Sequence, residues 1–539
     1  MRRSSRLTAG ALALLSAFVT AGCGLSEGRA PLPGNVVTFA YDQQPECLDP
    51  QVSPKDVTGL VTRNMVDSLV SMEPDGTFHP WLAKRWEISE DGRDYTFHLR
   101  DDVLFHDGTR FDASAVAATL DHAVAPETKS QYAVALARGY QRTTVVDATT
   151  VRIRLERPNA AFLQALSSPY LGIQSPKAIR SAKGGLCGGP VGSGPLRFVE
   201  WARNHRLVME RNDEYRWNPG SARHRGPVRY DGLVIEFIDE DAARFGALTS
   251  GQVDAAGNIP PSKAATLDVT RGLRLHSTPV PGAVFNVVFN TTHGPLRDER
   301  LRRALMLSVD LDSLVETVFF GRNARAWSPL SPATPHYSAR TEGSWRYDRR
   351  EAARLLDAAG WTGRDEEGYR TKDGRRLTLS WPYAADLQAK ADILGQGIQA
   401  EAKKSGIRLR WYPLDIGTYI KRTTAGRGLD MYSTSFVRAE PDILRFFHGS
   451  RETLAQGGGN VFGVDEPELD AALDAGAAAT DPRERERAYA RAQRYILDHA
   501  LVMPVYVPTA LVGASDRVRG LTFDASAYPL FHDVVREEP

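Results

Sequence analysis

Short apolar runs rich in β-branched and aromatic residues recur along the chain, separated by longer stretches in which apolar residues follow a helical repeat. Runs of this kind, bounded by Gly, Pro, Asn or Asp, are typical of strands. No short repeat of fixed period is present, which disfavours solenoids and propellers. The pattern therefore predicts a mixed α/β protein. The predicted strands cover residues 36–41, 95–99, 103–106, 149–154, 207–210, 233–238, 284–290, 377–381, 407–412 and 503–507.

Several of the intervening stretches carry the boundary residues of helices. Asp112 is placed to cap a helix over residues 111–124, because an Asp side chain accepts hydrogen bonds from the free N–H groups of a first turn. Asp481 before Pro482 opens another helix, which runs to about residue 499.

Two further helices are predicted from apolar stripes. Asp348 and Glu351 have the spacing of a capping box before the first stripe, and Gly360 is placed to end that helix. Gly406 closes the second stripe in the same way. The stripes consist of Ala352, Leu355, Leu356 and Ala359, and of Leu387, Ala391, Leu394, Ile398 and Ala402.

The first 22 residues form a segment of a different kind. Three arginines and no acid precede an apolar run over residues 7–19, which ends in Thr20, Ala21, Gly22 and Cys23. A basic start, an apolar core of this length and small residues before a break are typical of a secretory signal. A Cys in this position resembles the lipobox of bacterial lipoproteins, in which the Cys is acylated and becomes the first mature residue. A non-lipidated signal and a retained membrane anchor are the alternatives.

Composition and charge narrow the class of protein. The chain has 539 residues, 42% hydrophobic and 25% charged, close to an average soluble globular protein. This excludes a polytopic membrane protein, a collagen-like fibre and a largely disordered chain. The formal charge is +1, and removal of residues 1–22 leaves 64 basic against 66 acidic side chains, a charge of −2. Such a balance argues against nucleic-acid binding.

Two cysteines, Cys47 and Cys187, remain after the signal. Two thiols in an exported protein indicate one disulfide, although two separately buried thiols are the alternative. No CxxC or HExxH spacing is present, so no metal site is predicted. No cofactor is predicted either.

Catalytic motifs are missing from the sequence. Residues 192–194 read Gly-Ser-Gly and do not form GxSxG, so the nucleophile-elbow interpretation fails. The glycine-rich run over residues 184–194 lacks the Lys-Ser/Thr of a phosphate-binding loop. His106 beside Asp107 is explained best by a hairpin turn. The sequence therefore does not indicate an enzyme.

Five motifs, in order along the chain, resemble family 5 of the bacterial extracellular solute-binding proteins, the peptide/nickel type that includes the oligopeptide- and dipeptide-binding proteins. The resemblance covers about residues 36–508. The matching residues are Leu82, Ala83 and Trp86 with Asp91-Gly92 and Phe105-His106-Asp107-Gly108; residues 191–195; residues 286–290 with 295–298; residues 302–305; and residues 354–356 with 359–361.

The resemblance implies an α/β, two-lobed clamp of the periplasmic-binding-protein type II class, with an additional β-rich domain inserted in the first lobe. We expect the chain to cross between lobes near residues 279–284 and 501–504. Cys47 and Cys187 would then lie near the departure from the first lobe and the return to it, which favours their disulfide. The expected parts are a signal peptide at 1–22, a lipidated tether at 23–34, lobe I at 35–70, 192–280 and 503–539, the extra domain at 71–191, and lobe II at 281–502.

The resemblance also implies a ligand site between the lobes. In peptide-binding members an acidic residue after a second-lobe strand pairs with the peptide amino terminus, but Arg438 occupies that region here. Glu440 or Asp442 is a candidate to replace that acidic residue, although either could instead cap a helix. Arg438 is a candidate for binding a carboxylate of the ligand. Core packing is the alternative role for the aromatic candidates. The candidate contacts are Tyr41, Gln44, Glu46, Phe285, Trp381, Tyr383, Phe436, Arg438, Glu440 and Asp442.

The function implied is that of a substrate-binding lipoprotein of an ABC importer. It would be anchored through Cys23 to the outer face of the cytoplasmic membrane and would capture peptides as a monomer. It would deliver them to a membrane permease with its ATPase. A nickel chelate, a siderophore or a glycan is the alternative cargo. An exported hydrolase and a binding module for signalling or chaperoning are the alternatives of a different class.

Overall fold

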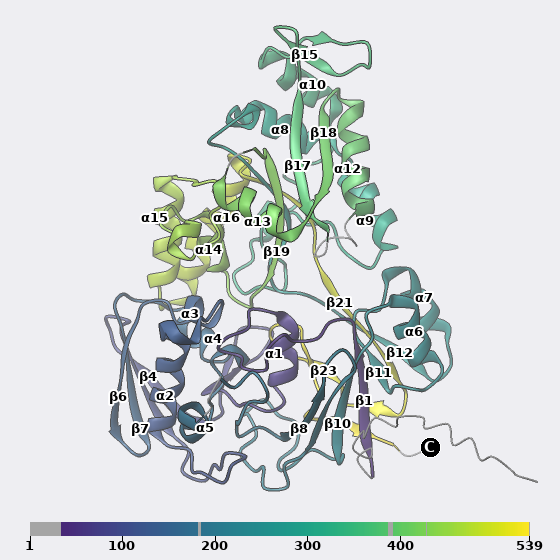
Figure 1. The fold of residues 1–539 in the computed structure, drawn as a ribbon. Coiled ribbons are helices and arrows are strands. Elements are labelled where there is room, and N and C mark those ends of the chain that lie inside the picture. The colour runs from purple at the N-terminus through teal and green to yellow at the C-terminus, as the bar shows by residue number, and fades with distance from the viewer. Residues whose placement is uncertain (1–33, 182–184, 386–391, 427, 538–539) are drawn as a thin grey trace, which may run out of the picture.

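A seven-stranded sheet forms the base of the molecule in Figure 1. The computed structural model describes residues 34–181, 185–385, 392–426 and 428–537. β1 lies inside this sheet and runs parallel to both neighbours, β10 and β11. We call the part built on this sheet the first lobe. In spatial order its strands are β12 (Leu273–Pro279), β21 (Thr509–Ser515), β11 (Ala255–Ala256), β1 (Val36–Tyr41), β10 (Gly232–Phe237), β9 (Arg206–Arg211) and β8 (Leu196–Ala202).

Helices cover the first-lobe sheet. α1 (Asp56–Thr62) places Val57, Leu60 and Val61 in a core with Val37 and Phe39 of β1. α6 (Asp241–Thr249) and α7 (Pro261–Val269) pack on the other end of the sheet, at the right of Figure 1.

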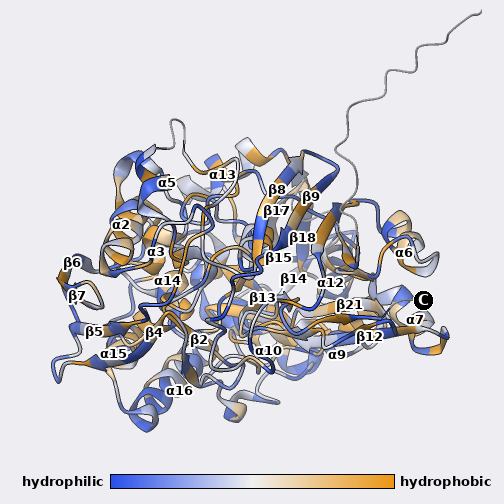
Figure 2. Ribbon diagram, turned by 90° about the horizontal axis from the view of Figure 1, so that it is seen from below, coloured by the Kyte–Doolittle hydropathy of each residue, from blue (hydrophilic) through white to orange (hydrophobic). Residues whose placement is uncertain are grey.

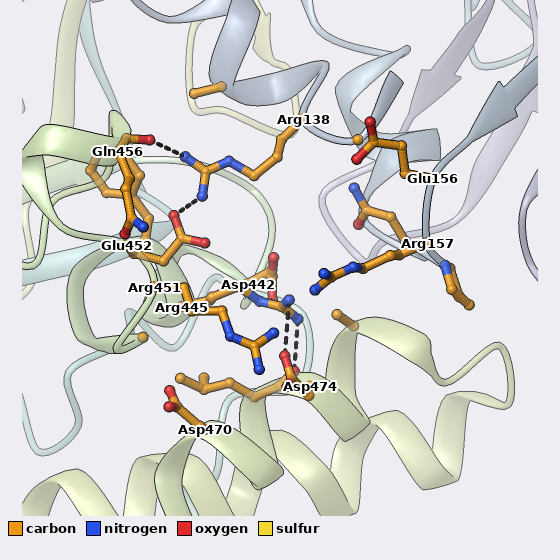
Figure 3. A pocket seen from close by; sticks show the side chains of 18 of the residues that line it. Arg138, Glu156, Arg157, Asp442, Arg445, Arg451, Glu452, Gln456, Asp470 and Asp474 are labelled. Atoms are coloured by element: carbon orange, nitrogen blue, oxygen red, sulfur yellow. Dashed lines mark hydrogen bonds and ion pairs between the residues drawn. The ribbon is translucent and has the colours of Figure 1, made fainter. Parts of the chain in front are cut away.

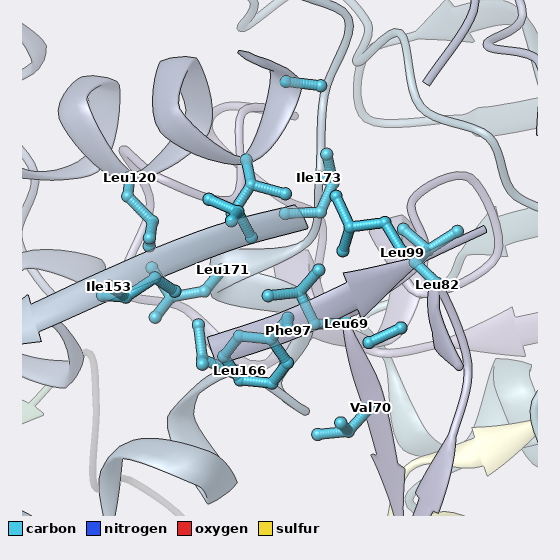
Figure 4. Packing of buried hydrophobic residues seen from close by; sticks show 14 of the residues in the cluster. Leu69, Val70, Leu82, Phe97, Leu99, Leu120, Ile153, Leu166, Leu171 and Ile173 are labelled. Atoms are coloured by element: carbon cyan, nitrogen blue, oxygen red, sulfur yellow. The ribbon is translucent and has the colours of Figure 1, made fainter. Parts of the chain in front are cut away.

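A four-stranded antiparallel sheet lies beside the first lobe. Its strands are β4 (Ala83–Ile88), β5 (Asp94–Leu99), β7 (Thr150–Leu155) and β6 (Tyr140–Asp147). α2 (Ala113–Val124) packs Leu120 against Phe97 and Ile153 in a shared core (Figure 4). We call this sheet, with α2, α3 (Ala133–Leu136), α4 (Phe162–Ala165) and α5 (Pro176–Ser181), the four-stranded domain. The hairpin of β2 (Val70–Met72) and β3 (Phe78–Pro80) precedes it.

The prediction of a strand at residues 103–106 is wrong. The segment makes only an isolated bridge from Leu104 to Arg110. The tight turn that follows is as expected: the Gly108 N–H donates to the Phe105 carbonyl over 2.9 Å, and Gly108 has a φ of +78°. The apolar run is buried by packing against the domain core, at Val103 and Phe105, rather than by pairing in a sheet.

The second lobe, at the top of Figure 1, is built on β13 (Gly282–Phe289), which pairs with β19 (Met431–Val437) and β20 (Val502–Tyr506). β17 (Thr378–Ala384) and β18 (Arg408–Leu414) form a parallel pair beside it. Its helices are α8 (Glu299–Ser308), α9 (Leu311–Phe319), α10 (Arg349–Ala358), α12 (Asp392–Lys404), α13 (Ile416–Ala425), α14 (Ile443–His448), α15 (Pro467–Ala478) and α16 (Pro482–Asp498).

Two neighbouring segments connect the lobes. β12 leads into β13, and β20 leads into β21, and the Val280 N–H donates to the Pro508 carbonyl over 2.8 Å where the two segments pass. We call residues 279–282 and 506–509 the hinge. The first crossing lies where it was expected, near 279–284. Because β20 pairs with β13 through Tyr506, residues 502–506 lie in the second-lobe sheet, so the boundary expected at 503 is a few residues too early.

The predicted helix boundaries are confirmed at their caps. The Asp112, Asp348 and Asp481 carboxylates each accept from two N–H groups of the following turn. Gly360 and Gly406 follow α10 and α12 with φ of +86° and +82°, a conformation that favours glycine. Leu387 and Ala391 of the second stripe lie outside the described residues.

The disulfide between Cys47 and Cys187 is present and closes a loop with a sequence separation of 140. It ties the segment after β1 to the segment before β8. Cys23 and the predicted signal lie outside the described residues.

Hydrophobic and hydrophilic segments are interleaved over the elements of the fold (Figure 2). In the described part of the chain, no helix combines the length and apolarity that crossing a membrane requires.

Candidate ligand-binding site

A cavity of about 370 Å³ lies between the four-stranded domain and the second lobe (Figure 3). The four-stranded domain contributes Ala135 and Arg138 near α3 and the loop of residues 156–159 after β7. The second lobe contributes Arg438, the start of α14, the loop of residues 449–456 and one face of α15. A cavity of this size can hold a small organic molecule.

Contacts at the cavity wall join its two sides. Arg138 forms an ion pair with Glu452 and donates to the Gln456 carbonyl over 3.4 Å (Figure 3). Next to it, the Ala160 N–H donates to the Ala477 carbonyl over 2.8 Å. The two sides of the cavity are therefore in contact in this structure.

The two acidic candidates after β19 are engaged by arginines of the same lobe. Glu440 is buried, 3% exposed, and forms an ion pair with Arg485. Burial lowers the pKa of Arg485, but Glu440, Tyr489 and Asp442 together outweigh this effect and raise the pKa above its ordinary value. Asp442 accepts from the Tyr489 hydroxyl over 2.8 Å and pairs with Arg445 at 3.1 Å. Asp442 stands at the N-cap of α14 without making a side-chain cap.

Arg438 differs from the other arginines of the cavity. It is 9% exposed, its Nε has no hydrogen-bond partner, and no carboxylate among the described residues pairs with it. Its backbone N–H donates to the Pro281 carbonyl over 3.3 Å, which fixes the residue beside the hinge. Burial lowers the pKa of Arg138, and the charges of Arg445 and Arg438 add to this effect while Asp442 opposes it. Arg438 thus supplies an uncompensated buried positive charge at the cavity.

A glycine makes this placement possible. Gly282 has a φ of +106°, and a Cβ there would lie 2.6 Å from the Arg438 backbone nitrogen and 2.2 Å from the Phe436 carbonyl oxygen. Only a residue without a side chain lets β13 pass this close to the end of β19.

Aromatic rings cross from the four-stranded domain to the second lobe beside the cavity. Tyr132, which precedes α3, contacts Phe436 with ring centroids 5.3 Å apart. On its other side Tyr132 contacts Tyr170 edge-on at 4.8 Å. The Tyr170 hydroxyl donates to the Lys55 carbonyl over 2.8 Å. Of the aromatic candidates in the second lobe, Phe436 is the one that meets residues of the opposite side.

Phe285, Trp381 and Tyr383 lie in the interior of the second lobe and do not line the cavity. Phe285 stacks on Tyr506 at 5.0 Å. Trp381 is 1% exposed, and its Nε1–H donates to the Ser433 hydroxyl over 3.0 Å. Tyr383 stacks on Trp411 at 4.2 Å.

The three candidates from the first lobe contact first-lobe residues. The Gln44 side chain accepts from the Asn204 N–H over 2.8 Å, at the turn between β8 and β9. Glu46 pairs with Lys55 at 3.3 Å and accepts from Ser53. Tyr41 packs on Phe39 of the same strand, and the nearby Asp42 and Asp56 charges add to the effect of burial in raising its pKa.

Asp56 is a residue that the sequence did not single out. It stands in the first turn of α1 and accepts from the Tyr528 hydroxyl over 3.0 Å. Burial raises its pKa to about 6, and the hydrogen bond opposes this rise. Asp56 is nevertheless exposed to solvent and does not line the cavity. No periodic or motif signal marks Asp56, Tyr132, Tyr170 or Arg138.

One cluster in the described part of the chain has the composition of a metal site. His224 and His532 lie against Asp533, with Nδ1 to Oδ1 distances of 2.8 and 3.2 Å. The Asn218 amide is oriented by two hydrogen bonds with Gly226 and presents its N–H to His532 Nε2. The His532 proton is therefore on Nδ1, facing Asp533, and the cluster is better described as a hydrogen-bonded clasp.

The profile described as bacterial extracellular solute-binding proteins, family 5, middle, matches residues 77–456. The chain belongs to this family. The glutathione-binding protein GsiB of Salmonella paratyphi A is 26% identical over 521 residues, 94% of this chain and 97% of that protein. The heme-binding protein A of Haemophilus influenzae is 26% identical over 498 residues, 88% of this chain and 87% of that protein.

Solved structures show the same fold. NikA from Brucella suis, in complex with Fe(III)-EDTA, matches with a TM-score of 0.81 at 27% identity, over 93% of this chain and 100% of NikA. The periplasmic binding protein DppA from Helicobacter pylori, in complex with the peptide STSA, matches with a TM-score of 0.78 at 22% identity, over 93% of this chain and 98% of DppA. The predicted two-lobed α/β fold of the periplasmic binding proteins is confirmed.

Glu440→Gln tests whether this carboxylate is structural. Removing one partner of a buried ion pair leaves an uncompensated charge, so we expect the free energy of unfolding to fall by about 3–5 kcal/mol, measured by urea denaturation. Glu486→Gln, an exposed change one residue from Arg485, is the matched control and should change stability by less than about 0.5 kcal/mol. A Glu440→Gln variant as stable as the wild type would contradict the structural role.

Proposed function

We propose that this protein is the substrate-binding component of an ABC importer and that it captures short peptides in the cavity between its four-stranded domain and its second lobe. The observation that carries the proposal is Arg438: a buried guanidinium without a partner, facing a cavity with walls from both sides of the clamp. A buried unpaired charge is costly, and a carboxylate that forms two parallel hydrogen bonds with it removes that cost.

The ligands named for the relatives are consistent with a cargo that carries a carboxylate. One is described as glutathione-binding, one structure holds Fe(III)-EDTA and another holds a peptide. A peptide, glutathione and EDTA all carry carboxylates, so Arg438 suits each of them chemically. Among the three, we favour a peptide. The rings and hydroxyl groups of Tyr132 and Tyr170 lie near Arg438 and could contact an extended peptide along its length. The protein binds and releases its cargo and does not transform it.

A ligand that contacts both lobes favours the state in which they are together. The closed clamp then presents a surface formed by both lobes to a membrane permease and its ATPase. We further propose that Cys23 carries the lipid that holds the protein at the outer face of the cytoplasmic membrane, as a monomer.

Peptide binding and the role of Arg438 are tested together by equilibrium dialysis with a pool of di- to tetrapeptides, followed by mass spectrometry of the retained fraction. Wild-type protein should retain peptides. Arg438→Gln should weaken binding by about 10- to 100-fold, since a hydrogen bond to a charged group contributes about 1.5–3 kcal/mol. Arg110→Gln, an exposed change on the four-stranded domain, should have no effect.

If the wild type retains no peptide but binds Fe(III)-EDTA, the clamp serves a chelate and the peptide assignment is wrong. If Arg438→Gln binds as tightly as the wild type, Arg438 does not contact the cargo.

Lipidation is tested by Cys23→Ser. The wild type should fractionate with membranes and incorporate radiolabelled palmitate when expressed in a bacterium, and the variant should do neither, because acylation requires the thiol. A variant that is still labelled would contradict the assignment of Cys23.

A further inference from the structure

We propose that a second cavity, across the hinge from the one at Arg438, controls the balance between the open and the closed clamp. We call the two the hinge cavity and the cargo cavity. Opening the cargo cavity narrows the hinge cavity, so a side chain that fills the hinge cavity holds the clamp closed and tightens cargo binding. The inference goes beyond the proposed function, because it concerns the motion of the lobes and not the identity of the cargo.

The hinge cavity has a volume of about 510 Å³ and walls from both lobes. The first lobe contributes Ser277 and Pro279 near the end of β12 and Thr509 at the start of β21. The second lobe contributes one face of α9 and residues 321–325 after it. Pro279 and Thr509 belong to the hinge itself. A rotation of one lobe against the other about the hinge therefore changes the width of this cavity.

The walls of the hinge cavity are backbone segments that are bonded within the fold. The Asn323 side chain donates to the Val507 carbonyl over 3.0 Å, and the Val507 N–H donates to the Ala324 carbonyl over 2.8 Å. The Arg325 guanidinium donates to the Pro504 carbonyl over 2.6 Å. On the first-lobe side, β12 pairs with β21 along its whole length. Each wall therefore moves with its lobe, and the width of the cavity follows the angle between the lobes.

The two cavities lie on opposite sides of the hinge. In Figure 1, β12 and α9 of the hinge cavity lie to the right of β21, whereas α3, α14 and α15 of the cargo cavity lie to the left. A rotation about the hinge that separates α15 from the four-stranded domain therefore brings α9 toward β12. The hinge cavity is the space that this opening motion uses.

An ion pair joins the two lobes at the rim of the hinge cavity. The Arg322 guanidinium of the second lobe lies 2.6 Å from the carboxylate of Asp268, near the end of α7 in the first lobe. The next residue, Val269, is 84% exposed, and Phe320, two residues before Arg322, is 62% exposed. Two large apolar side chains are thus exposed on neighbouring rims, one on each lobe.

These two side chains favour the open clamp. As the hinge cavity narrows, the end of α7 approaches the end of α9, and Val269 and Phe320 remove apolar surface of each other from water. Burial of apolar surface stabilises the state in which it occurs. The cargo-free protein is therefore biased toward the open state, and cargo must overcome this bias when the clamp closes.

Variants that fill the hinge cavity test the inference from both lobes. Ser277→Trp on β12 and Ala324→Trp after α9 each introduce an indole at an exposed position that lines the cavity. Close-packed side chains resist compression, so small-angle scattering of either cargo-free variant should give a smaller radius of gyration than the wild type. Calorimetric titration should show tri-alanine bound about tenfold more tightly, because more of the free protein is already closed.

Variants of the rim test the bias toward the open state. Phe320→Ser and Val269→Ser should each tighten tri-alanine binding by about two- to tenfold, because the open state loses buried apolar surface. Thr144→Trp and Val146→Ser, at exposed positions of the edge strand β6, are the matched controls and should behave as the wild type.

The inference is overturned if a folded Ser277→Trp or Ala324→Trp variant keeps the wild-type radius of gyration, or if either binds tri-alanine no more tightly than Thr144→Trp does. It is also overturned if both rim variants bind as Val146→Ser does. If no variant and not the wild type binds a peptide, the proposed function fails, but the scattering of the cargo-free proteins still decides this inference. The two failures are therefore distinguishable.

Discussion

The hinge is the constraint on which the rest of the structure depends. Two crossings of the chain, bonded to each other from Val280 to Pro508, join sheets that are otherwise separate in hydrogen bonding. Each crossing is short and continues directly into paired strands on both sides, so the lobes can move relative to each other only about this region. Arg438 is bonded to the same region through Pro281. Its guanidinium therefore stays close to the pivot whether the cleft is open or closed, and a carboxylate bound there lies near the axis of closure.

The contacts that join the two sides of the cavity without cargo are weak. Arg138 of the Arg138–Glu452 pair is 39% exposed, and ion pairs with that much solvent contribute at most about 1 kcal/mol. The hydrogen bond from Ala160 to Ala477 adds a contribution of similar size. Arg438 disfavours the closed state, because its buried guanidinium pairs with no carboxylate among the described residues. A cargo whose carboxylate pairs with Arg438 removes this cost and favours the closed state.

Strands could be predicted where an apolar run in the sequence also pairs with a neighbouring strand in a sheet, as in β1, β13 and β18. The segment at 103–106 has the same composition but packs into a core without pairing, a difference that only the tertiary structure decides. The boundary at 503 was misplaced because β20 continues its pairing with β13 for a few residues more. The caps of α2, α10 and α16 were predictable because capping depends on local chemistry alone.

Less of the candidate site than of the fold could be predicted from the sequence. Arg438 stood out because the resemblance to peptide-binding members of the family implied an acid in this region of the sequence. Arg138 and Tyr132 meet residues of the second lobe only in the fold, so no spacing in the sequence connects them. Phe285, Trp381 and Tyr383 had the chemistry of cleft aromatics but lie in the core, the usual place of large rings.

The central claim is that cargo, by bridging two lobes, closes the clamp. Its most direct test is the distance between spin labels at Val145→Cys on β6 and Ile420→Cys on α13, two exposed positions on opposite sides of the cavity, with the native disulfide intact. Without cargo, double electron–electron resonance should give a broad distribution that extends to long distances. Saturating tri-alanine should narrow it to a single shorter distance. A distribution that does not change while the peptide is bound would contradict the account.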